Sequence, residues 1–328
     1  MKPPIAITIG DFNGIGPEII LKSLQSPAIK KICAPVLVGP LGVFEHVSSS
    51  LKIPVKLEKA IFPWNKESSI PVVDIGDGLR SDVIFGSVTK AAGRNAGKAI
   101  EKAVELCVNK RVAAMVTAPI SKEALNLAGY NFPGQTEMVT LFSRSQRVAM
   151  LFIAGKLKVG LVTIHSSLSE VVASITKEKV IEKSTIIYES LQSLFGIEEP
   201  TIAILGLNPH AGERGLMGME EIETITPAID ELKSKGMNIS GPYPADAFFG
   251  TGSHKKFDAI VALYHDQGLI PFKMLAFERG VNFSAGLPII RTSPDHGTAY
   301  DIAGKGSASP ESMIEAIKLA VQFSTKKL

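Results

Sequence analysis

The sequence is poor in cysteine. Only two cysteines, Cys33 and Cys107, occur among its 328 residues, and they lie far apart with no C-x-x-C spacing. We therefore expect neither a disulfide framework nor a thiolate metal site, and the cysteine content fits a reduced compartment.

Charge of one sign and long apolar runs are also scarce. The formal net charge is +3 at pH 7, and basic residues form no block before the short pair Lys326 and Lys327, which argues against a nucleic-acid partner. No apolar run approaches the roughly 20 residues of a membrane helix, and the N-terminus shows no secretory hydrophobic region. We therefore expect a cytoplasmic protein with no membrane partner.

Apolar residues make up 45% of the chain and charged residues 20%, enough for a substantial core. Predicted helices alternate with mostly short, non-alternating apolar strands, which indicates the α/β class with a largely parallel sheet. Expected strands cover residues 5–10, 34–39, 112–117, 148–154, 156–164, 202–210, 259–265 and 289–294, with a hairpin turning at Gly155. Expected helices cover residues 19–24, 88–108, 123–127, 170–195, 220–235 and 310–323.

Three of the apolar runs deliver a histidine just as turn-forming residues begin. These histidines are His165, His210 and His265, half of the six in the chain. In open α/β sheets, ligands bind outside the carboxyl ends of the strands, so three imidazoles there could share one divalent metal. The alternative is three unrelated histidines that cap strands. Asp266 and Glu213 could each orient an imidazole from behind, or be solvated loop acids.

Several residues suit an anionic ligand. Lys273, Asn282 and Arg291 recur around a strand-like segment, 283–290, and could bind a phosphate or carboxylate by charge-assisted hydrogen bonds. Each basic residue alone is more typical of a surface charge. Thr136 stands at a predicted helix start, as a cap or a ligand contact.

The segment Ser293–Gly306 is rich in glycine and could bring backbone close to a flat ligand, with His296 and Asp301 near a base or ribose. A plain surface loop is the alternative. The loop after the first strand, Asp11–Glu18, is not a dinucleotide fingerprint, because Ile19 stands where the third glycine would be needed.

Five motifs together resemble one enzyme family. The run His-Gly-Thr-Ala-Tyr-Asp-Ile-Ala-Gly-Lys-Gly (296–306) is similar to the adenine-side cofactor loop of β-decarboxylating dehydrogenases such as isocitrate and isopropylmalate dehydrogenase. Together with that run, the other motifs resemble the 4-hydroxythreonine-4-phosphate dehydrogenase family of pyridoxal phosphate biosynthesis. They are Thr-Ile-Gly-Asp and Gly-Ile-Gly-Pro-Glu (8–18), Asn-Pro-His-Ala-Gly-Glu (208–213), Tyr-His-Asp-Gln-Gly-Leu (264–269) and Ser-Pro-Asp-His-Gly-Thr-Ala (293–299).

The resemblance implies a fold of two α/β/α domains with mostly parallel sheets, separated by an active-site cleft. It implies a first domain of residues 1–128 plus about 303–328 and a second of about 129–302, with a homodimer whose active site lies at the interface. The three metal-binding histidines of the family fall on His165, His210 and His265, and they need not come from one subunit.

The resemblance also implies the ligands. NAD or NADP would be held by the loop of His296, Gly297 and Asp301, and a divalent metal would be zinc by preference, or cobalt or magnesium. Substrate contacts would be Gln135, Thr136, Lys273, Asn282 and Arg291. The reaction would oxidise C3 of 4-phosphooxy-L-threonine and decarboxylate it to 3-amino-2-oxopropyl phosphate, with Lys273 or Asp246 transferring protons.

Two departures from the family pattern bear on the substrate. Gln135 stands where the family has histidine, and an amide cannot shuttle a proton. Phe12-Asn13 replaces the usual Pro-Ala of the first loop. Another phosphorylated hydroxy acid, 4-phosphoerythronate or 4-phosphothreonate, therefore stays open as the substrate. A zinc hydrolase is an alternative from another class, but it leaves the 293–306 loop unexplained.

Overall fold

The computed structural model describes residues 2–64, 69–76 and 83–326. The chain divides into two compact units, Met1–Gln146 with Leu287–Leu328, and Arg147–Gly286. Neither boundary falls where the domains were predicted, because α6 (Gln135–Phe142) packs against α4 (Lys90–Val108), and β12 (Arg291–Pro294) pairs with β5 (Ala114–Thr117). In the part of the chain that the structure describes, no helix combines the length and apolar character needed to cross a bilayer.

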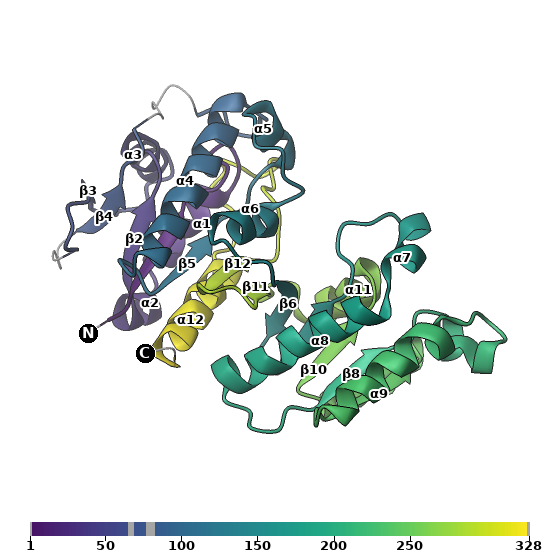
Figure 1. Ribbon diagram of the computed structural model, residues 1–328. Helices are drawn as coiled ribbons and strands as arrows, with labels where there is room; N and C mark the ends of the chain where they lie inside the picture. Colours follow the sequence, from purple (N-terminus) through teal and green to yellow (C-terminus); the bar gives the residue numbers. More distant parts are fainter. Residues whose placement is uncertain (1, 65–68, 77–82, 327–328) are drawn as a thin grey trace. The chain divides into compact units, whose positions relative to one another are not determined.

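The first unit contains a sheet with the strand order β3-β4-β2-β1-β5-β12 (Figure 1). Each of its pairings is parallel. Its remaining strands are β1 (Pro4–Thr8), β2 (Ala34–Val38), β3 (Leu57–Lys59) and β4 (Ile70–Val73). Its remaining helices are α1 (Gly16–Ser23), α2 (Pro27–Ile32), α3 (Leu41–Ser50), α5 (Lys122–Leu127) and α12 (Glu311–Lys326).

Burial explains why β1 is central in this sheet. Ile5, Ala6 and Ile7 are fully buried on both faces, as expected for a strand covered by helices on each side. Helix α4 packs against β1, and α12 packs against β12 and β5. The carboxyl ends of β1, β5 and β12 therefore lie at one edge of this sheet, where loops can present side chains to a ligand.

The second unit contains strands in the order β11-β6-β7-β10-β8-β9. The strands are β6 (Ala149–Ala154), β7 (Leu157–Leu161), β8 (Ile202–Leu205), β9 (Ile239–Tyr243), β10 (Ala259–Ala262) and β11 (Val281–Ala285). β6 runs antiparallel to both β7 and β11, which confirms the predicted hairpin at Gly155, while β7, β10, β8 and β9 are mutually parallel. The α/β class with a mostly parallel sheet is confirmed.

Helices cover both faces of this second sheet. They are α7 (Leu168–Ser174), α8 (Lys177–Ser190), α9 (Thr226–Ser234), α10 (Ala245–Gly250) and α11 (His265–Ala276), with short helices η2 (Leu191–Phe195), η3 (Pro209–Gly215), η4 (Glu221–Ile225) and η5 (Ser253–Lys256). Along β7, Gly160 faces Ile187 of α8, whereas Leu161 packs with Phe272 of α11. Because successive strand residues face opposite sides, α8 and α11 lie on opposite faces.

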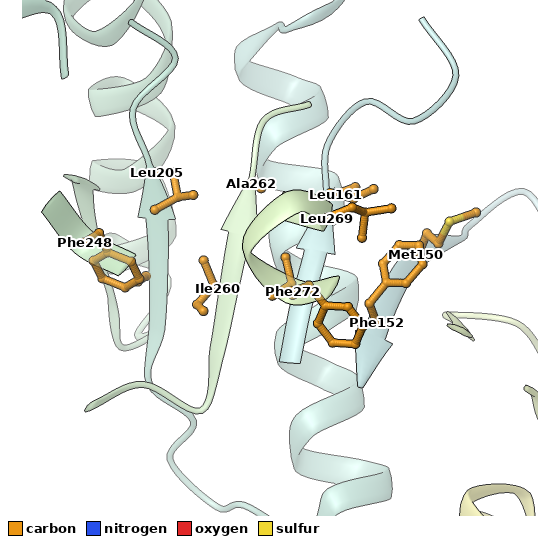
Figure 2. Close-up of a cluster of buried hydrophobic side chains, with 11 residues drawn as sticks. Met150, Phe152, Leu161, Leu205, Phe248, Ile260, Ala262, Leu269 and Phe272 are labelled. Carbon is orange, nitrogen blue, oxygen red and sulfur yellow. The ribbon is translucent and has the colours of Figure 1, made fainter. Parts of the chain in front are cut away.

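Figure 2 shows the core on the α11 face of this unit. Leu205, Ala262 and Leu161 are the last residues of three neighbouring parallel strands, and all three are fully buried. The segments that follow β7, β8 and β10 therefore leave the sheet at the same edge, and the buried last residue of each strand fixes where its segment begins.

Three predicted elements were wrong in detail. The strand-like segment 283–290 is a strand only as far as Ala285, where β11 ends. Gly286 follows with a φ of +83°, which few residues other than glycine adopt, and β12 begins at Arg291. The helix expected over 170–195 is broken at Ile175 and Thr176, where the chain is extended and Thr176 caps α8. The residues after His265, for which we expected no helix, form α11.

Candidate active site

The three histidines lie beyond the carboxyl ends of neighbouring parallel strands. His165 follows β7, His210 lies in η3 after β8, and His265 begins α11 after β10. In this sheet β10 lies between β7 and β8. One edge of the second unit therefore carries all three imidazoles.

Two of these imidazoles are close to each other. The ring centroids of His165 and His265 are 6.4 Å apart, and Nδ1 of His265 lies 2.7 Å from Oδ1 of Asp266. A carboxylate on one ring nitrogen fixes the ring and leaves the other nitrogen, Nε2, to bind a metal. Of the two acids considered as orienting groups, Asp266 occupies that position.

No three histidine, cysteine or acidic side chains converge as a closed metal site within residues 2–64, 69–76 and 83–326. The structure thus brings His165 and His265 together but does not add His210 to them within one chain. Neutral imidazole nitrogen suits zinc and cobalt, and His265 already has the supporting carboxylate that ligating histidines usually have. The chemistry of these donors therefore fits a divalent metal.

His210 is held in an unusual backbone conformation. From His210 to Arg214 every residue has a positive φ, 53° at His210 itself, so this is a left-handed turn. Each non-glycine residue in that region costs about 1–2 kcal/mol. Backbone strain of this kind persists only where the surroundings impose it, and it is concentrated at functional sites. The buried carboxylate of Glu221, which the sequence motifs did not indicate, binds the backbone just before this turn.

Arg291 forms the centre of a buried polar cluster in the first unit. Its guanidinium donates from Nε and Nη2 to the hydroxyl oxygen of Thr117 at 3.1 and 2.8 Å, and from Nη1 to that of Thr136 at 3.4 Å. Arg291 is only 2% exposed. Burial lowers its pKa to about 10, with the carboxylate of Glu137 acting in the opposite direction, so it is still a cation at neutral pH.

Thr117 is a contact that the sequence reasoning missed, although it ends the predicted strand 112–117. Gln135 and Thr136 begin α6, and Gln135 donates from Nε2 to the carbonyl oxygen of Ala118 at 3.2 Å. Oε1 of Gln135 and Oε2 of Glu137 are buried without a hydrogen-bond partner among the described residues. The buried cation can pair with an anionic group of a ligand, whereas the two unsatisfied oxygens are acceptors that need a donor such as a hydroxyl or ammonium group.

The other predicted catalytic and substrate residues belong to the second unit. Asn282 lies in β11 opposite Phe152, and its Oδ1 is also buried without a partner in the part of the chain described. Lys273 lies in the last turn of α11 and is half-buried. Asp246 is exposed in the first turn of α10, a helix that contacts η3 and hence the His210 turn.

The predicted cofactor loop is attached to the loop after β1. The backbone N–H of Ile15 donates to the carbonyl of Thr298 at 2.9 Å, and the hydroxyl of Tyr300 donates to Oδ2 of Asp11 at 2.7 Å. Burial is the main cause that raises the pKa of Tyr300, so Tyr300 stays a donor. Nδ1 of His296 lies 3.1 Å from the carbonyl oxygen of Gly297.

Gly297 and Asp301 are exposed, and His296 is half-buried. These three residues are accessible to a ligand, while the loop behind them is fixed by Asp11 and Tyr300. The motifs 8–18 and 293–299, which are far apart in the sequence, therefore contact each other in the folded chain.

Asn13, one of the two departures in the first loop, has a structural role here. It is fully buried and accepts at Oδ1 from the N–H of Ile84 at 2.8 Å. Its Nδ2 donates to the carbonyl of Ser87 and the hydroxyl of Thr89, at 2.9 and 3.0 Å. This departure from the family pattern holds the segment before α4, and it gives no sign of altered substrate contacts.

The fully buried carboxyl of Asp11 predicts a pH effect on stability. Burial is the largest cause that raises its pKa above 3.8, against opposing hydrogen bonds from Tyr300, Asn13 and Gly14. Between the pKa of Asp11 in the unfolded chain and its higher pKa in the native state, the native state still holds a proton that the unfolded chain has lost. The native state therefore loses stability as pH rises between these two pKa values. The free energy of unfolding of the wild type, minus that of Asp11→Asn, should therefore fall from about pH 4 upward and then level off. Urea denaturation across pH measures it, and a difference that rises with pH would contradict the assignment.

These features define a class of protein. Two α/β units carry polar groups at the carboxyl ends of parallel strands, with a buried arginine for an anion and imidazoles suited to a metal. Such an arrangement is that of an α/β enzyme acting on a small anionic molecule.

The comparisons with known proteins give the family. Residues 31–320 match the family model described as pyridoxal phosphate biosynthetic protein PdxA, and the chain belongs to that family. A 4-hydroxythreonine-4-phosphate dehydrogenase from Desulforapulum autotrophicum is 43% identical over 99% of this chain and 96% of its own length. A D-threonate 4-phosphate dehydrogenase from Cupriavidus necator is 40% identical over 99% of this chain and 98% of its own.

A solved structure is similar over the same length. The crystal structure of 4-hydroxythreonine-4-phosphate dehydrogenase from Klebsiella pneumoniae has a TM-score of 0.89 and 39% identity, covering 99% of this chain and 98% of that one. The family resemblance predicted from the motifs is confirmed, and with it the class of oxidoreductases that act on a CH–OH group.

Proposed function

We propose that this protein oxidises 4-phosphooxy-L-threonine at C3 with NAD(P)+ and then decarboxylates it, in pyridoxal 5′-phosphate biosynthesis. The C3–H bond breaks as a hydride passes to the nicotinamide, and the hydroxyl proton goes to a base, giving a 3-keto acid. The bond from C2 to the carboxylate then breaks, carbon dioxide leaves, and protonation of C2 gives 3-amino-2-oxopropyl phosphate. The full-length similarity to enzymes named for this substrate carries the proposal.

The first unit would bind anionic parts of the substrate. Arg291 is a buried cation already oriented by Thr117 and Thr136, so a phosphate or carboxylate would meet a preformed donor. In the second unit, Lys273 and Asn282 would contact polar groups of the substrate, since Oδ1 of Asn282 has no partner among the described residues. Lys273 or Asp246 would move the protons at the hydroxyl and at C2.

His165, His210 and His265 would hold a divalent metal, zinc by preference, or cobalt or magnesium. When bound, such a metal polarises the oxygen on C3 and so favours both the oxidation and the loss of carbon dioxide. His296, Gly297 and Asp301 would hold the adenosine side of NAD or NADP.

A second copy of the chain is the proposed partner, with the active site at the interface of a homodimer in the cytoplasm. Ile270, Met274 and Phe277 recur at helical spacing along α11 and just after it, and they are 58%, 82% and 74% exposed. Apolar side chains that line one helix face in this way are typical of a protein contact. This helix begins with His265, so a partner there would lie near the metal-binding edge.

A second candidate substrate is D-threonate 4-phosphate or a similar acid such as 4-phosphoerythronate. The observation that favours it is Gln135, whose buried Oε1 lacks a partner where the family has a histidine. An amide offers both a donor and an acceptor but no positive charge.

The test is an assay of NADH and NADPH formation with all three phosphorylated acids, in the presence of zinc, cobalt or magnesium. We expect turnover of 4-phosphooxy-L-threonine with release of carbon dioxide. Hydrolysis without reduction of either nucleotide would overturn the proposal in favour of a zinc hydrolase. Faster turnover of D-threonate 4-phosphate would select the second candidate.

Replacing Gln135 tests what this position selects. In Gln135→His, the ratio of kcat/KM for 4-phosphooxy-L-threonine to that for D-threonate 4-phosphate should rise about tenfold, a change of roughly 1.4 kcal/mol. The family's own side chain would be restored next to Thr136, which contacts Arg291. Glu123→Gln, an exposed change on α5, is the control and should leave the ratio unaltered. A ratio unchanged in Gln135→His would show that selection depends on other residues.

A further inference from the structure

Glu221 is a carboxylate in an unusual place. Its side chain is 3% exposed, and it lies at the start of η4. Oε1 accepts from the backbone N–H groups of Leu207 and Asn208, both at 2.7 Å, and Oε2 accepts from Nδ2 of Asn208 at 2.9 Å. A buried carboxylate is costly unless such donors compensate it, so the residue is built into the segment that follows β8.

That segment leads directly into the left-handed turn of His210. A Cβ on Gly206 would lie 3.2 Å from Oε1 of Glu221, and one on Gly212 would lie 2.6 Å from Oε2. The carboxylate thus packs against glycines on both sides of His210. It fixes the chain before the turn and occupies the space beneath it, so the backbone direction at His210 is set by Glu221.

Gln267 links this segment to the next strand end. Its side chain is 9% exposed, accepts at Oε1 from the N–H of Leu263 at 2.7 Å, and donates from Nε2 to the carbonyl of Gly206 at 2.6 Å. Leu263 lies just before His265 and Gly206 just before the Glu221-bound residues. One amide therefore joins the two segments that carry His210 and His265.

A matching bond joins the third strand end. The hydroxyl of Thr163, two residues before His165, donates to the carbonyl of Leu263 at 2.7 Å. The strand ends that carry the three histidines are thereby connected side by side through buried polar groups.

We propose that Glu221 and Gln267 are positioning residues for the metal-binding histidines. They hold the His210 turn and the start of α11 in place before a metal arrives, so that the metal does not have to order these loops. The inference rests on the proposed metal-dependent function. It predicts a specific signature: the two residues affect metal affinity, while turnover at saturating metal is largely retained.

Glu221→Gln and Gln267→Glu test this with little change of volume. The first removes the charge and one acceptor for Asn208, and the second replaces the donor to Gly206 with an oxygen. Glu223→Gln is the control, because Glu223 is an exposed acid in the same short helix η4. Each protein is stripped of metal and titrated with Co²⁺, whose visible absorption reports the dissociation constant and the ligand geometry. Far-ultraviolet circular dichroism and the unfolding midpoint of the metal-free proteins are measured in parallel.

We expect Co²⁺ to bind 10- to 100-fold more weakly in both variants, the range typical for groups that support metal ligands. At saturating Co²⁺ kcat should return to within about threefold of the wild type, with Glu223→Gln unchanged throughout. Unaltered Co²⁺ affinity in both variants would overturn the inference, as would the loss of folded metal-free protein in both, since the pair would then serve the fold alone. Failure of the wild type to bind Co²⁺ would instead refute the proposed metal-dependent function.

Discussion

His210→Asn is expected to lower kcat about a thousandfold and to remove stoichiometric binding of zinc or cobalt. The size of the fall in kcat follows from the several kcal/mol by which a bound metal stabilises developing charge on a substrate oxygen. Each tenfold change in rate corresponds to about 1.4 kcal/mol. Asparagine is chosen because it tolerates the positive φ of 53° that His210 adopts, so the left-handed turn is preserved. Metal analysis of the purified protein and the NADH assay measure the two effects.

His46→Asn makes the same replacement in α3, in the first unit. The His46 ring stacks with Phe85 at 6.4 Å between centroids, and it has no proposed role in catalysis. This control should bind metal and turn over as the wild type does. Full activity in a metal-free His210→Asn protein would contradict the metal-dependent mechanism.

Local patterns predicted the parts of the fold that depend on near neighbours in sequence. The hairpin at Gly155 follows from two apolar runs separated by a turn, and it forms β6 and β7. The placement of His165, His210 and His265 after strands follows from apolar runs that end in polar residues. Each of these signals lies within about ten residues, which is the range over which periodicity is informative.

The contacts that shape the site could not be found in this way. Thr117 and Arg291 are far apart in sequence, and only the parallel pairing of β5 with β12 brings the hydroxyl to the guanidinium. Glu221 reads as one more acid at the start of a helix, and its burial depends on the left-handed turn before it. Tertiary packing decides these positions, and a single sequence carries no local trace of it.

The departure at Asn13 illustrates the same limit. From the sequence, Phe12-Asn13 in place of Pro-Ala suggested a changed substrate. In the structure the Asn13 side chain bonds to three residues of the segment before α4, so its reason is structural. Gln135 is different, because one of its atoms has no partner within the described chain, and the question of substrate falls on that residue.

Arg291 should be the residue on which binding of the anionic substrate depends most. Arg291→Gln is expected to lower kcat/KM roughly 30- to 5,000-fold, which corresponds to about 2–5 kcal/mol of lost transition-state stabilisation. The reason is that the anionic group of the substrate is then buried without a counterion. The kcat/KM of Arg291→Lys should lie between those of the wild type and Arg291→Gln. Lysine keeps the charge, but it has no planar guanidinium that can donate to Thr117 and to the ligand together. Steady-state kinetics and direct titration with inorganic phosphate measure the effect.

The unliganded protein should react differently from the complex. Arg291 is a desolvated cation whose pKa is already lowered to about 10, so its removal relieves a desolvation cost in the free protein but also leaves the carboxylate of Glu137 without its cation. Because these two effects oppose each other, the unfolding midpoint of Arg291→Gln should stay near that of the wild type, while phosphate no longer raises it. Arg94→Gln, an exposed arginine on α4, is the matched control and should alter neither quantity. A folded Arg291→Gln enzyme within threefold of wild-type kcat/KM would show that the anion binds elsewhere. The combination of lost binding with retained stability is the result that assigns the buried charge to function, because a residue kept for the fold would lower both together.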